Sequence, residues 1–173
     1  MDHRDILIDA ARRPVDSARQ VLDGIGPEVL NQMPDGEHSS IAWLIWHAAR
    51  QQDAQLAELS GGRQVWLEQG WAQRLGVHRA VEEIGFGDSP AEVATVRVTD
   101  PALLGDYLQA VVARVVDHVE GLSPADLDDV VDVRWDPPVT RGVRIVSIID
   151  DAVAHVAQAA YLRGLLENWR IGY

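Results

Sequence analysis

The sequence contains no cysteine among its 173 residues. This absence excludes a disulfide scaffold, a cysteine-based zinc ribbon, a redox CxxC motif and a cysteine nucleophile. Positive charge is also scarce, because 15 basic residues stand against 27 acidic ones and the formal net charge is −12. Such a chain repels phosphate backbones and has no large basic stripe that would overcome the repulsion. Nucleic acid is therefore not expected as a partner.

Long hydrophobic runs are missing too. The first 20 residues are interrupted by charges and do not resemble a signal peptide. The longest apolar runs are far shorter than the roughly 18 residues that span a bilayer, so we expect no membrane association and a cytoplasmic protein. A domain of this length buries roughly 70% of the surface of its unfolded chain. Residues 1–173 are thus expected to form a single domain in which any metal is functional rather than structural.

Four segments show the three- and four-residue spacing of apolar side chains that is typical of amphipathic helices. The first covers residues 5–22 and contains Pro14, where a kink or a restart is expected because proline lacks an N–H donor. Serine, aspartate and glycine residues mark the ends of the next two. These later helices are predicted to begin at Ser39 or Ser40, at Asp100-Pro101 and at about Val146, and to end at Gly61-Gly62, at Gly121 and near the C-terminus.

The connections between these helices differ in kind. Residues 24–37 form a loop, whereas 62–99 is long and contains a short helix predicted at 64–75. Residues 123–144 hold a capped short helix followed by a turn between two short extended pieces. The pattern predicts an all-α fold, an antiparallel four-helix bundle with at least one crossover, long connecting loops and short extra helices. Sites in such bundles are built from inward-facing side chains.

His47 lies in the most apolar stretch of the second helix. Trp43 and Leu44 precede it by four and three residues and share its face, which predicts that the imidazole is buried. Taken alone, His47 is most simply interpreted as a core histidine that hydrogen-bonds a carbonyl.

Asp151 and His155 change that interpretation. They are four residues apart on the fourth helix, so both project from one face within reach of a single ion. A carboxylate in an apolar stripe needs an arginine, an imidazolium or a metal beside it, unless Asp151 simply faces solvent. With His47 from another helix the pair makes a three-ligand site, and three protein ligands with an open fourth position are typical of catalytic zinc.

With these residues in view, the sequence resembles the DinB-like four-helix metal-binding family, in particular its actinobacterial mycothiol S-transferase branch. The resemblance lies in residues 38–56, 64–77, 134–151 and 150–166. Family members carry a metal-binding histidine on the second helix and a pair spaced by four, often His-x3-His followed by Gly-Gln, on the last. His47, the Asp151 and His155 pair, and Gln158 match these positions, whereas Asp151 replaces a common histidine and Ala157 replaces the usual glycine.

The resemblance implies a divalent metal, most often zinc, that activates a small thiol such as mycothiol for attack on an electrophilic or xenobiotic substrate. It assigns His47, Asp151 and His155 as metal ligands. Gln158, three residues after His155, could orient a ligand or bind the thiol, or could be an exposed polar residue. A thiol-dependent isomerase, a metal-assisted hydrolase and a non-catalytic metal-binding bundle are the alternatives.

Four further residues are candidates for contacts with the thiol cofactor. Arg134, Arg141 and Arg144 gather positive charge that could receive an anionic cofactor, or they could pair with the acidic residues between 128 and 136. Trp46, like Trp66 and Trp71, could wall a substrate pocket or belong to the core. A homodimer through an exposed face of the bundle also remains open.

Overall fold

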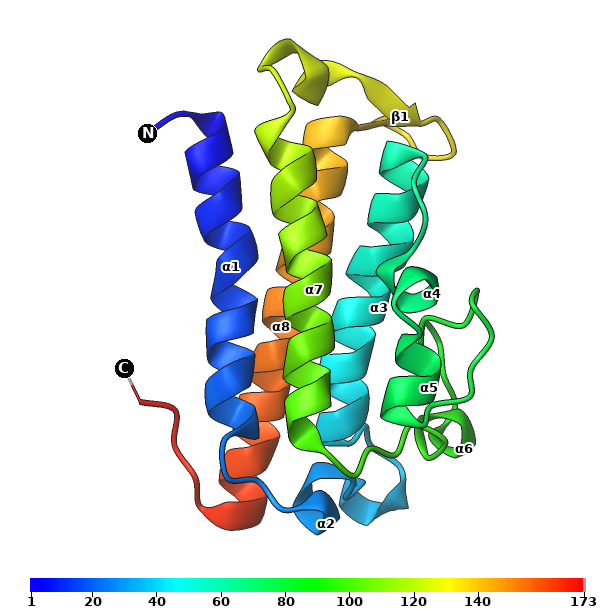
Figure 1. Cartoon of the computed structure of the whole chain (residues 1–173), viewed down its shortest axis with the longest axis vertical. Coiled ribbons are helices and arrows are strands. Elements are labelled where there is room, and N and C mark those ends of the chain that lie inside the picture. Colours follow the sequence, from blue (N-terminus) through cyan, green and yellow to red (C-terminus); the bar gives the residue numbers. More distant parts are fainter. Residues whose placement is uncertain (173) are drawn as a thin grey trace.

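The structure, a computed structural model, describes residues 1–172. Within this range four long helices form a bundle (Figure 1). They are α1 (His3–Leu22), α3 (Ile41–Ser60), α7 (Pro101–Glu120) and α8 (Arg141–Glu167). The connections carry the short elements α2 (Pro27–Leu30), η1 (Pro34–Gly36), α4 (Val65–Glu68), α5 (Trp71–Leu75), α6 (Pro90–Val93), η2 (Ala125–Asp128), β1 (Val130–Asp132) and β2 (Val139–Thr140).

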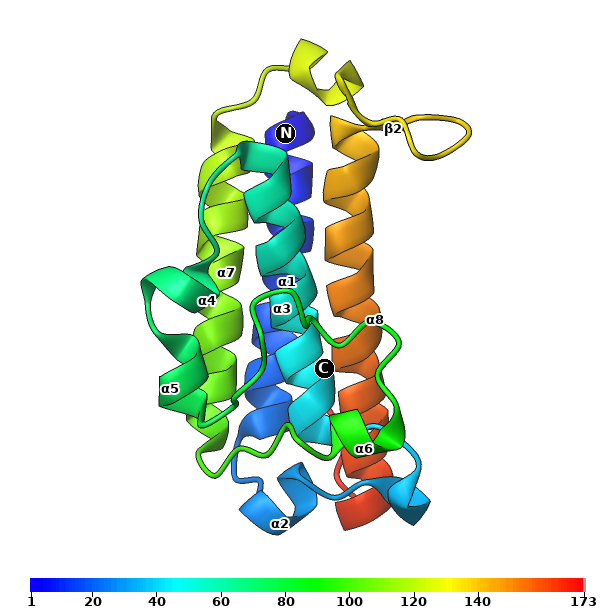
Figure 2. The same ribbon diagram turned by 90° about the vertical axis from the view of Figure 1, so that its right-hand side faces the viewer.

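The order of the long helices around the bundle confirms the predicted crossover. Helices α1 and α3 each pack against both α7 and α8. Figures 1 and 2 show α3 and α7 running in the same direction, so the connection between them returns along the bundle. In Figure 2 this connection crosses in front of α3 and reaches α8. The long predicted loop therefore covers the seam between these two helices.

Side-chain caps explain where the long helices begin. Ser40 accepts a hydrogen bond from the Trp43 amide and Asp100 accepts one from the Ala102 amide, as predicted for α3 and α7. The predicted start of the last helix near Val146 is wrong. Thr140 caps α8 through the Val143 amide, so the helix begins at Arg141 and runs to Glu167.

Pro14 does not interrupt the first helix. Helix α1 continues from His3 to Leu22 with Pro14 inside it, so of the two expectations, a kink or a restart, the restart is wrong. The buried residues Ala11, Val15 and Ala18 lie on the face that packs in the bundle. Packing of this face outweighs the loss of one backbone hydrogen bond at the proline.

The short elements are mostly as expected. The predicted helix at 64–75 is divided into α4 and α5 by Gly70, whose φ of 64° is left-handed. The predicted extended pieces are confirmed, because β1 pairs antiparallel with β2 through Val130 with Thr140 and Asp132 with Val139. This hairpin lies at one end of the bundle, beside the first turn of α8 (Figure 2).

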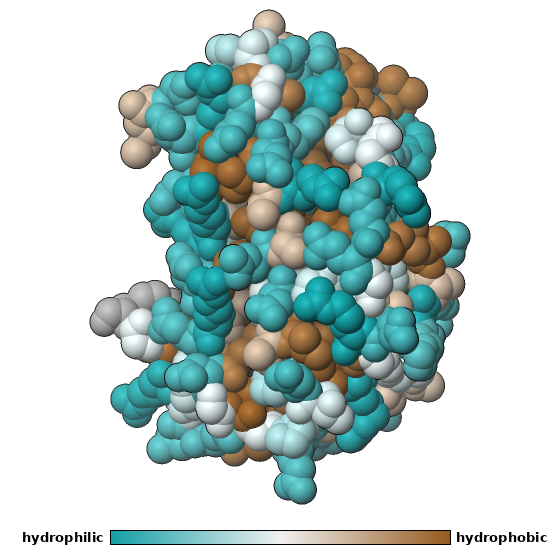
Figure 3. All heavy atoms as spheres, in the orientation of Figure 1, coloured by the Kyte–Doolittle hydropathy of each residue, from teal (hydrophilic) through white to brown (hydrophobic). Residues whose placement is uncertain are grey.

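By length and composition, α8 is long and apolar enough to cross a membrane. The sequence did not indicate this, because charged residues interrupt its apolar runs. In the fold, however, its residues Ile145, Ile148, Ala152 and Val156 are buried in the bundle. Hydrophilic residues cover most of the face seen in Figure 3, on which α8 lies behind α1 and α7. Helix α8 therefore contributes one apolar face to the core of the bundle.

A buried polar network joins α3 to α7 and to the start of the long connection. Both Asp53 carboxylate oxygens accept hydrogen bonds at 2.7 Å, from the amides of Val65 and Trp66. The Tyr107 hydroxyl donates to the same carboxylate at 2.9 Å, and Arg50 lies 3.7 Å from it. Asp53 is therefore held by Arg50, Tyr107 and two backbone amides and does not join His47 on the metal-facing side. The network fixes the position of α4 on the bundle.

Removing the Tyr107 hydroxyl should destabilise the fold. In Tyr107→Phe the buried Asp53 carboxylate loses a donor, so we expect the free energy of unfolding to fall by about 1–3 kcal/mol. Urea denaturation measures it. The control is Tyr161→Phe, because Tyr161 is 70% exposed and its change should stay within about 0.5 kcal/mol. Equal stability of the two variants would mean that the network contributes no net stability.

Candidate metal centre

The structure brings the three predicted ligands together between α3 and α8. His47 projects from α3, and Asp151 and His155 project from adjacent turns of α8. One ligand atom from each lies within 4.8 Å of the others. The His47 and His155 rings meet edge to face with centroids 4.6 Å apart, and His155 Nε2 lies 3.6 Å from Asp151 Oδ1. Two imidazoles and one carboxylate therefore converge on one point.

Hydrogen bonds at the far side of each ring decide which nitrogen faces that point. His47 Nδ1 bonds to the Ile84 carbonyl, and His155 Nδ1 bonds to Gln158 Oε1 at 3.0 Å. A carbonyl oxygen only accepts, so each Nδ1 must carry the proton. In the neutral rings Nε2 is then the unprotonated nitrogen and keeps its lone pair for a ligand. Gln158 thus orients His155, one of the two roles that the sequence suggested for it.

Protonation of the two rings follows their surroundings. Burial lowers the pKa of His47, more than the Ile84 hydrogen bond raises it. Burial also acts to lower the pKa of His155, but the Asp151 carboxylate and Gln158 outweigh it and the net shift is upward. His47 is therefore neutral at pH 7, and His155 is the ring at which protons compete most strongly with a metal.

These residues fit a divalent metal. Asp151 Oδ2 is buried and has no hydrogen-bond partner among the described residues, and a buried carboxylate oxygen requires a positive partner. Two atoms that bind one zinc ion at about 2.1 Å lie at most about 4.2 Å apart. The spread of the three ligand atoms, up to 4.8 Å, is close to that limit. Three such ligands leave further coordination positions for a substrate.

The segment around Ile84 and Gly85 is a part of the site that sequence reasoning missed. Gly85 has a φ of +98°, and a Cβ there would lie 2.7 Å from His47 Nδ1 and 3.1 Å from the Trp43 ring. Only glycine allows the backbone to approach this closely. The two glycines that flank Phe86 signal unusual backbone conformations, but nothing local in the sequence connects them with His47.

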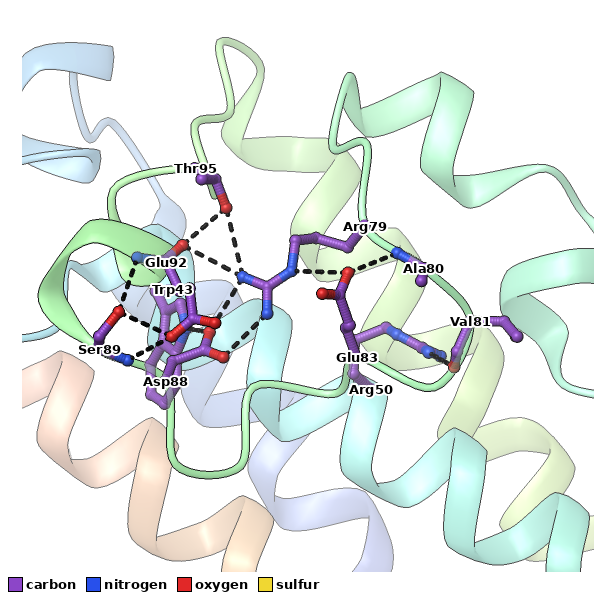
Figure 4. A network of polar contacts seen from close by, with 10 residues as sticks. All are labelled: Trp43, Arg50, Arg79, Ala80, Val81, Glu83, Asp88, Ser89, Glu92 and Thr95. Atoms are coloured by element: carbon purple, nitrogen blue, oxygen red, sulfur yellow. Dashed lines mark hydrogen bonds and ion pairs between the residues drawn. The ribbon is translucent and has the colours of Figure 1, made fainter.

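An ion pair closes this segment into a loop over α3. Arg79 binds both carboxylate oxygens of Asp88, at 3.1 and 2.8 Å, and the Trp43 indole donates to Asp88 at 2.9 Å (Figure 4). Burial acts to raise the pKa of Asp88, but Arg79 and Trp43 outweigh it, so the net pKa is low and the carboxylate stays charged. Arg50 also donates to the Val81 carbonyl at 2.6 Å. We call residues 79–88 the clasp loop; it holds Ile84 against His47.

The three arginines that were predicted to contact the cofactor form ion pairs with aspartates at the same end of the fold. Arg134 and Arg144 pair with Asp132 at 2.8 and 2.9 Å, and Arg141 lies 3.3 Å from Asp129. These ion pairs are the second of the two roles that the sequence allowed for the three arginines. The aspartates neutralise the positive charge of the arginines, which an anionic cofactor would need for binding.

The interpretation of tryptophans as pocket walls is wrong. Trp46 is 0% exposed, and Trp66 and Trp71 are each 2% exposed. Trp46 packs beneath Gly85 and the Arg79 guanidinium. A ring enclosed in this way has no surface left to contact a ligand, so these side chains belong to the core.

Comparison with known proteins gives the family. Residues 10–159 match the DinB superfamily. The chain belongs to this superfamily. Its fold is also similar to the crystal structure of the conserved protein of locus from Enterococcus faecalis, with a TM-score of 0.90 and 35% identity over 98% of this chain and 99% of that one. No curated protein matches the chain in sequence. For this DinB-superfamily chain, the evidence for a function therefore comes from the arrangement of the site.

The clasp loop should control metal affinity through Gly85. In Gly85→Ala the new methyl group collides with His47, so the Ile84 carbonyl and the ring must separate, and we expect zinc affinity to fall roughly 10–100-fold. Competition with a chromogenic chelator measures it. Gly87→Ala is the matched control, because Gly87 also has a positive φ, of +77°, but an added methyl group there would meet nothing within 4 Å. Equal losses in both variants would assign the effect to backbone strain instead.

Proposed function

We propose that this DinB-superfamily chain is a metal-dependent transferase that joins a low-molecular-weight thiol, mycothiol or a similar compound, to an electrophilic substrate. The observation that supports it is the convergence of His47, Asp151 and His155 in a chain without cysteine. The chain has no sulfur nucleophile of its own, so a thiol must come from a co-substrate. The proposal includes a cytoplasmic location and two small molecules as the partners.

A divalent metal such as zinc, when bound here, supplies Lewis acidity that lowers the pKa of a coordinated thiol from about 8.5 to below neutral pH. The chain's own residues prepare the site for it. His47 and His155 present unprotonated Nε2 atoms because Ile84 and Gln158 accept their Nδ1 protons. Asp151 contributes negative charge that offsets part of the charge of a dication.

The environment suits attack on an electrophile. The thiol proton leaves to solvent, the sulfur forms a bond with an electrophilic carbon, and a leaving group departs with its electron pair. Asp151 is partly open to solvent, with a side chain 38% exposed, so the site can be reached from outside the bundle. Phe86 follows Gly85 in the clasp loop and is 91% exposed, so it offers apolar surface beside the site.

Metal content tests the site first. We expect close to one zinc ion per chain after reconstitution and dialysis, measured by mass spectrometry of the metal. His47→Ala and His155→Ala should each lose most of it, because two ligands hold a dication far more weakly than three. His78→Ala should retain it, since His78 is exposed and lies outside the triad. Full occupancy in both ligand variants would refute the site.

Conjugation tests the reaction. We expect the zinc-loaded chain to consume thiol and a chromogenic aryl halide in equal amounts, whereas His155→Ala and chelator-treated protein should fall to the uncatalysed rate. The enzyme's advantage over that rate should grow as pH falls from 8 towards 7, because the free thiol, with a pKa of about 8.5, loses thiolate nearly tenfold per unit. A metal-loaded protein that hydrolyses esters but consumes no thiol would instead support a hydrolase.

A further inference from the structure

The outer face of α8 is apolar along most of its length. Its large exposed side chains, which are between 43% and 70% exposed, are those of Val143, Val146, Val153, Tyr161 and Leu165. Asp150 is the one charged residue among the exposed residues between positions 143 and 165. We call the exposed residues of this range the α8 strip.

Helix α1, the neighbouring helix, has the outer face expected of a helix that lies against water. Most of its exposed residues are charged, and they form ion pairs such as that of Arg13 with Asp9. The long helices that pack against α8 are α1 and α3. Within the part of the chain that the structure describes, no other long helix covers the outer side of α8 (Figure 2). A long apolar strip left open in this way marks a surface for contact with another molecule.

A groove between α1 and α8 extends this surface. Its volume is about 400 Å³. Val153, Ala157 and Tyr161 of the strip form one wall of the groove, and Pro14 and Trp169 line it from α1 and from the segment after α8. The groove therefore gives room for side chains of a molecule that lies along the strip.

Charge narrows the choice of that molecule. An amphipathic helix that binds an anionic membrane surface carries basic residues beside its apolar face, and none of the exposed residues of the α8 strip is basic. Two copies of the chain repel each other through their net charge of −12. They approach at the lowest electrostatic cost through a face that carries a single charge, and the α8 strip is such a face.

The strip is also complementary to a second copy of itself. Near its middle lies the small residue Ala154, which allows two helices to approach closely. In an antiparallel pair with a two-fold axis near Ala154, Val143 of one copy lies beside Leu165 of the other. Val146 and Tyr161 meet in the same way. Each of these contacts occurs twice, as two-fold symmetry requires.

The single charge of the strip selects the antiparallel orientation. In that pair Asp150 of one copy faces Ala157 of the other, because the two residues lie on opposite sides of the axis at similar distances from it. The two Asp150 carboxylates are then about seven residues apart, roughly 10 Å along the helix axis. In a parallel pair they would face each other and repel.

We infer that the α8 strip is the interface of a reversible, antiparallel homodimer. A strip that is roughly 33 Å long and about 10 Å wide covers on the order of 350 Å² in each copy. Standard interfaces bury about 800 Å² in each partner. The strip and its groove therefore hold a dimer that dissociates on dilution to micromolar concentration, rather than an obligate one.

This interface lies beside the metal centre. Ala154 and Gln158, at one edge of the strip, follow Asp151 and His155 by three residues and are their neighbours on the helix surface. The second copy borders the centre on this side without supplying a ligand. Dimerisation therefore narrows the opening of the site and leaves the metal ligands unchanged.

Sedimentation velocity of the full-length chain over a concentration series tests the dimer. We expect the average mass to rise from that of one chain to that of two. Ala157→Glu places a carboxylate opposite Asp150 of the second copy, so Kd should rise at least about tenfold. Ala113→Glu is the matched control, because it makes the same change at an exposed position of α7, and it should leave Kd unchanged.

Two further variants test the orientation. Ala157→Lys places an ammonium group opposite Asp150 in both symmetric contacts, so Kd should fall by about two- to fivefold. In a parallel pair the two new ammonium groups would face each other and Kd would rise, which would overturn the orientation. Ala154→Cys, near the axis of a chain that has no cysteine, should give a disulfide-linked dimer under mild oxidation, whereas Ala113→Cys should not.

The inference fails if the chain stays monomeric at every concentration, or if Ala157→Glu and Ala113→Glu weaken the dimer equally. Binding of the monomer to phosphatidylcholine vesicles would also overturn it and would assign the strip to a membrane. These measurements involve neither metal nor thiol. A monomer would therefore leave the proposed function standing, and a dimer without metal-dependent conjugation would leave the interface standing.

Discussion

The hydrogen bond from His47 Nδ1 to the Ile84 carbonyl is the contact on which the site depends. A buried N–H group needs an acceptor, and here the acceptor comes from a loop 37 residues further along the chain. The bond decides that His47 Nε2 faces Asp151 and His155. It also requires the loop backbone to lie directly on the imidazole, an approach that the absence of a side chain at Gly85 allows.

Helix α3 organises the molecule because it buries an unusual number of polar side chains. Arg50, Gln51, Gln52 and Asp53 are each at most 2% exposed. Buried polar groups need partners, and the partners of these residues lie on different sides of the helix. Arg50 and Asp53 hold the long connection, including the clasp loop, whereas Gln51 binds the backbone of α8. The same helix therefore positions the covering loop and lines the seam that leads away from the metal ligands.

Electrostatics gives the two ends of this seam different chemistry. Near His47, one carboxylate and two imidazole nitrogens offer lone pairs to a cation. At the hairpin, the arginines are already paired with Asp132 and Glu58.

Local sequence determined the four long helices, most of their ends and the pairing of Asp151 with His155. Caps, glycines and helical periodicity act over a few residues, and two side chains four apart on a helix meet whatever surrounds them. Tertiary structure alone decided that α1 continues through Pro14 and that Trp46 lies in the core. It also brought Ile84 to His47. These features depend on contacts between segments far apart in the chain, and their partners become neighbours only when the bundle packs.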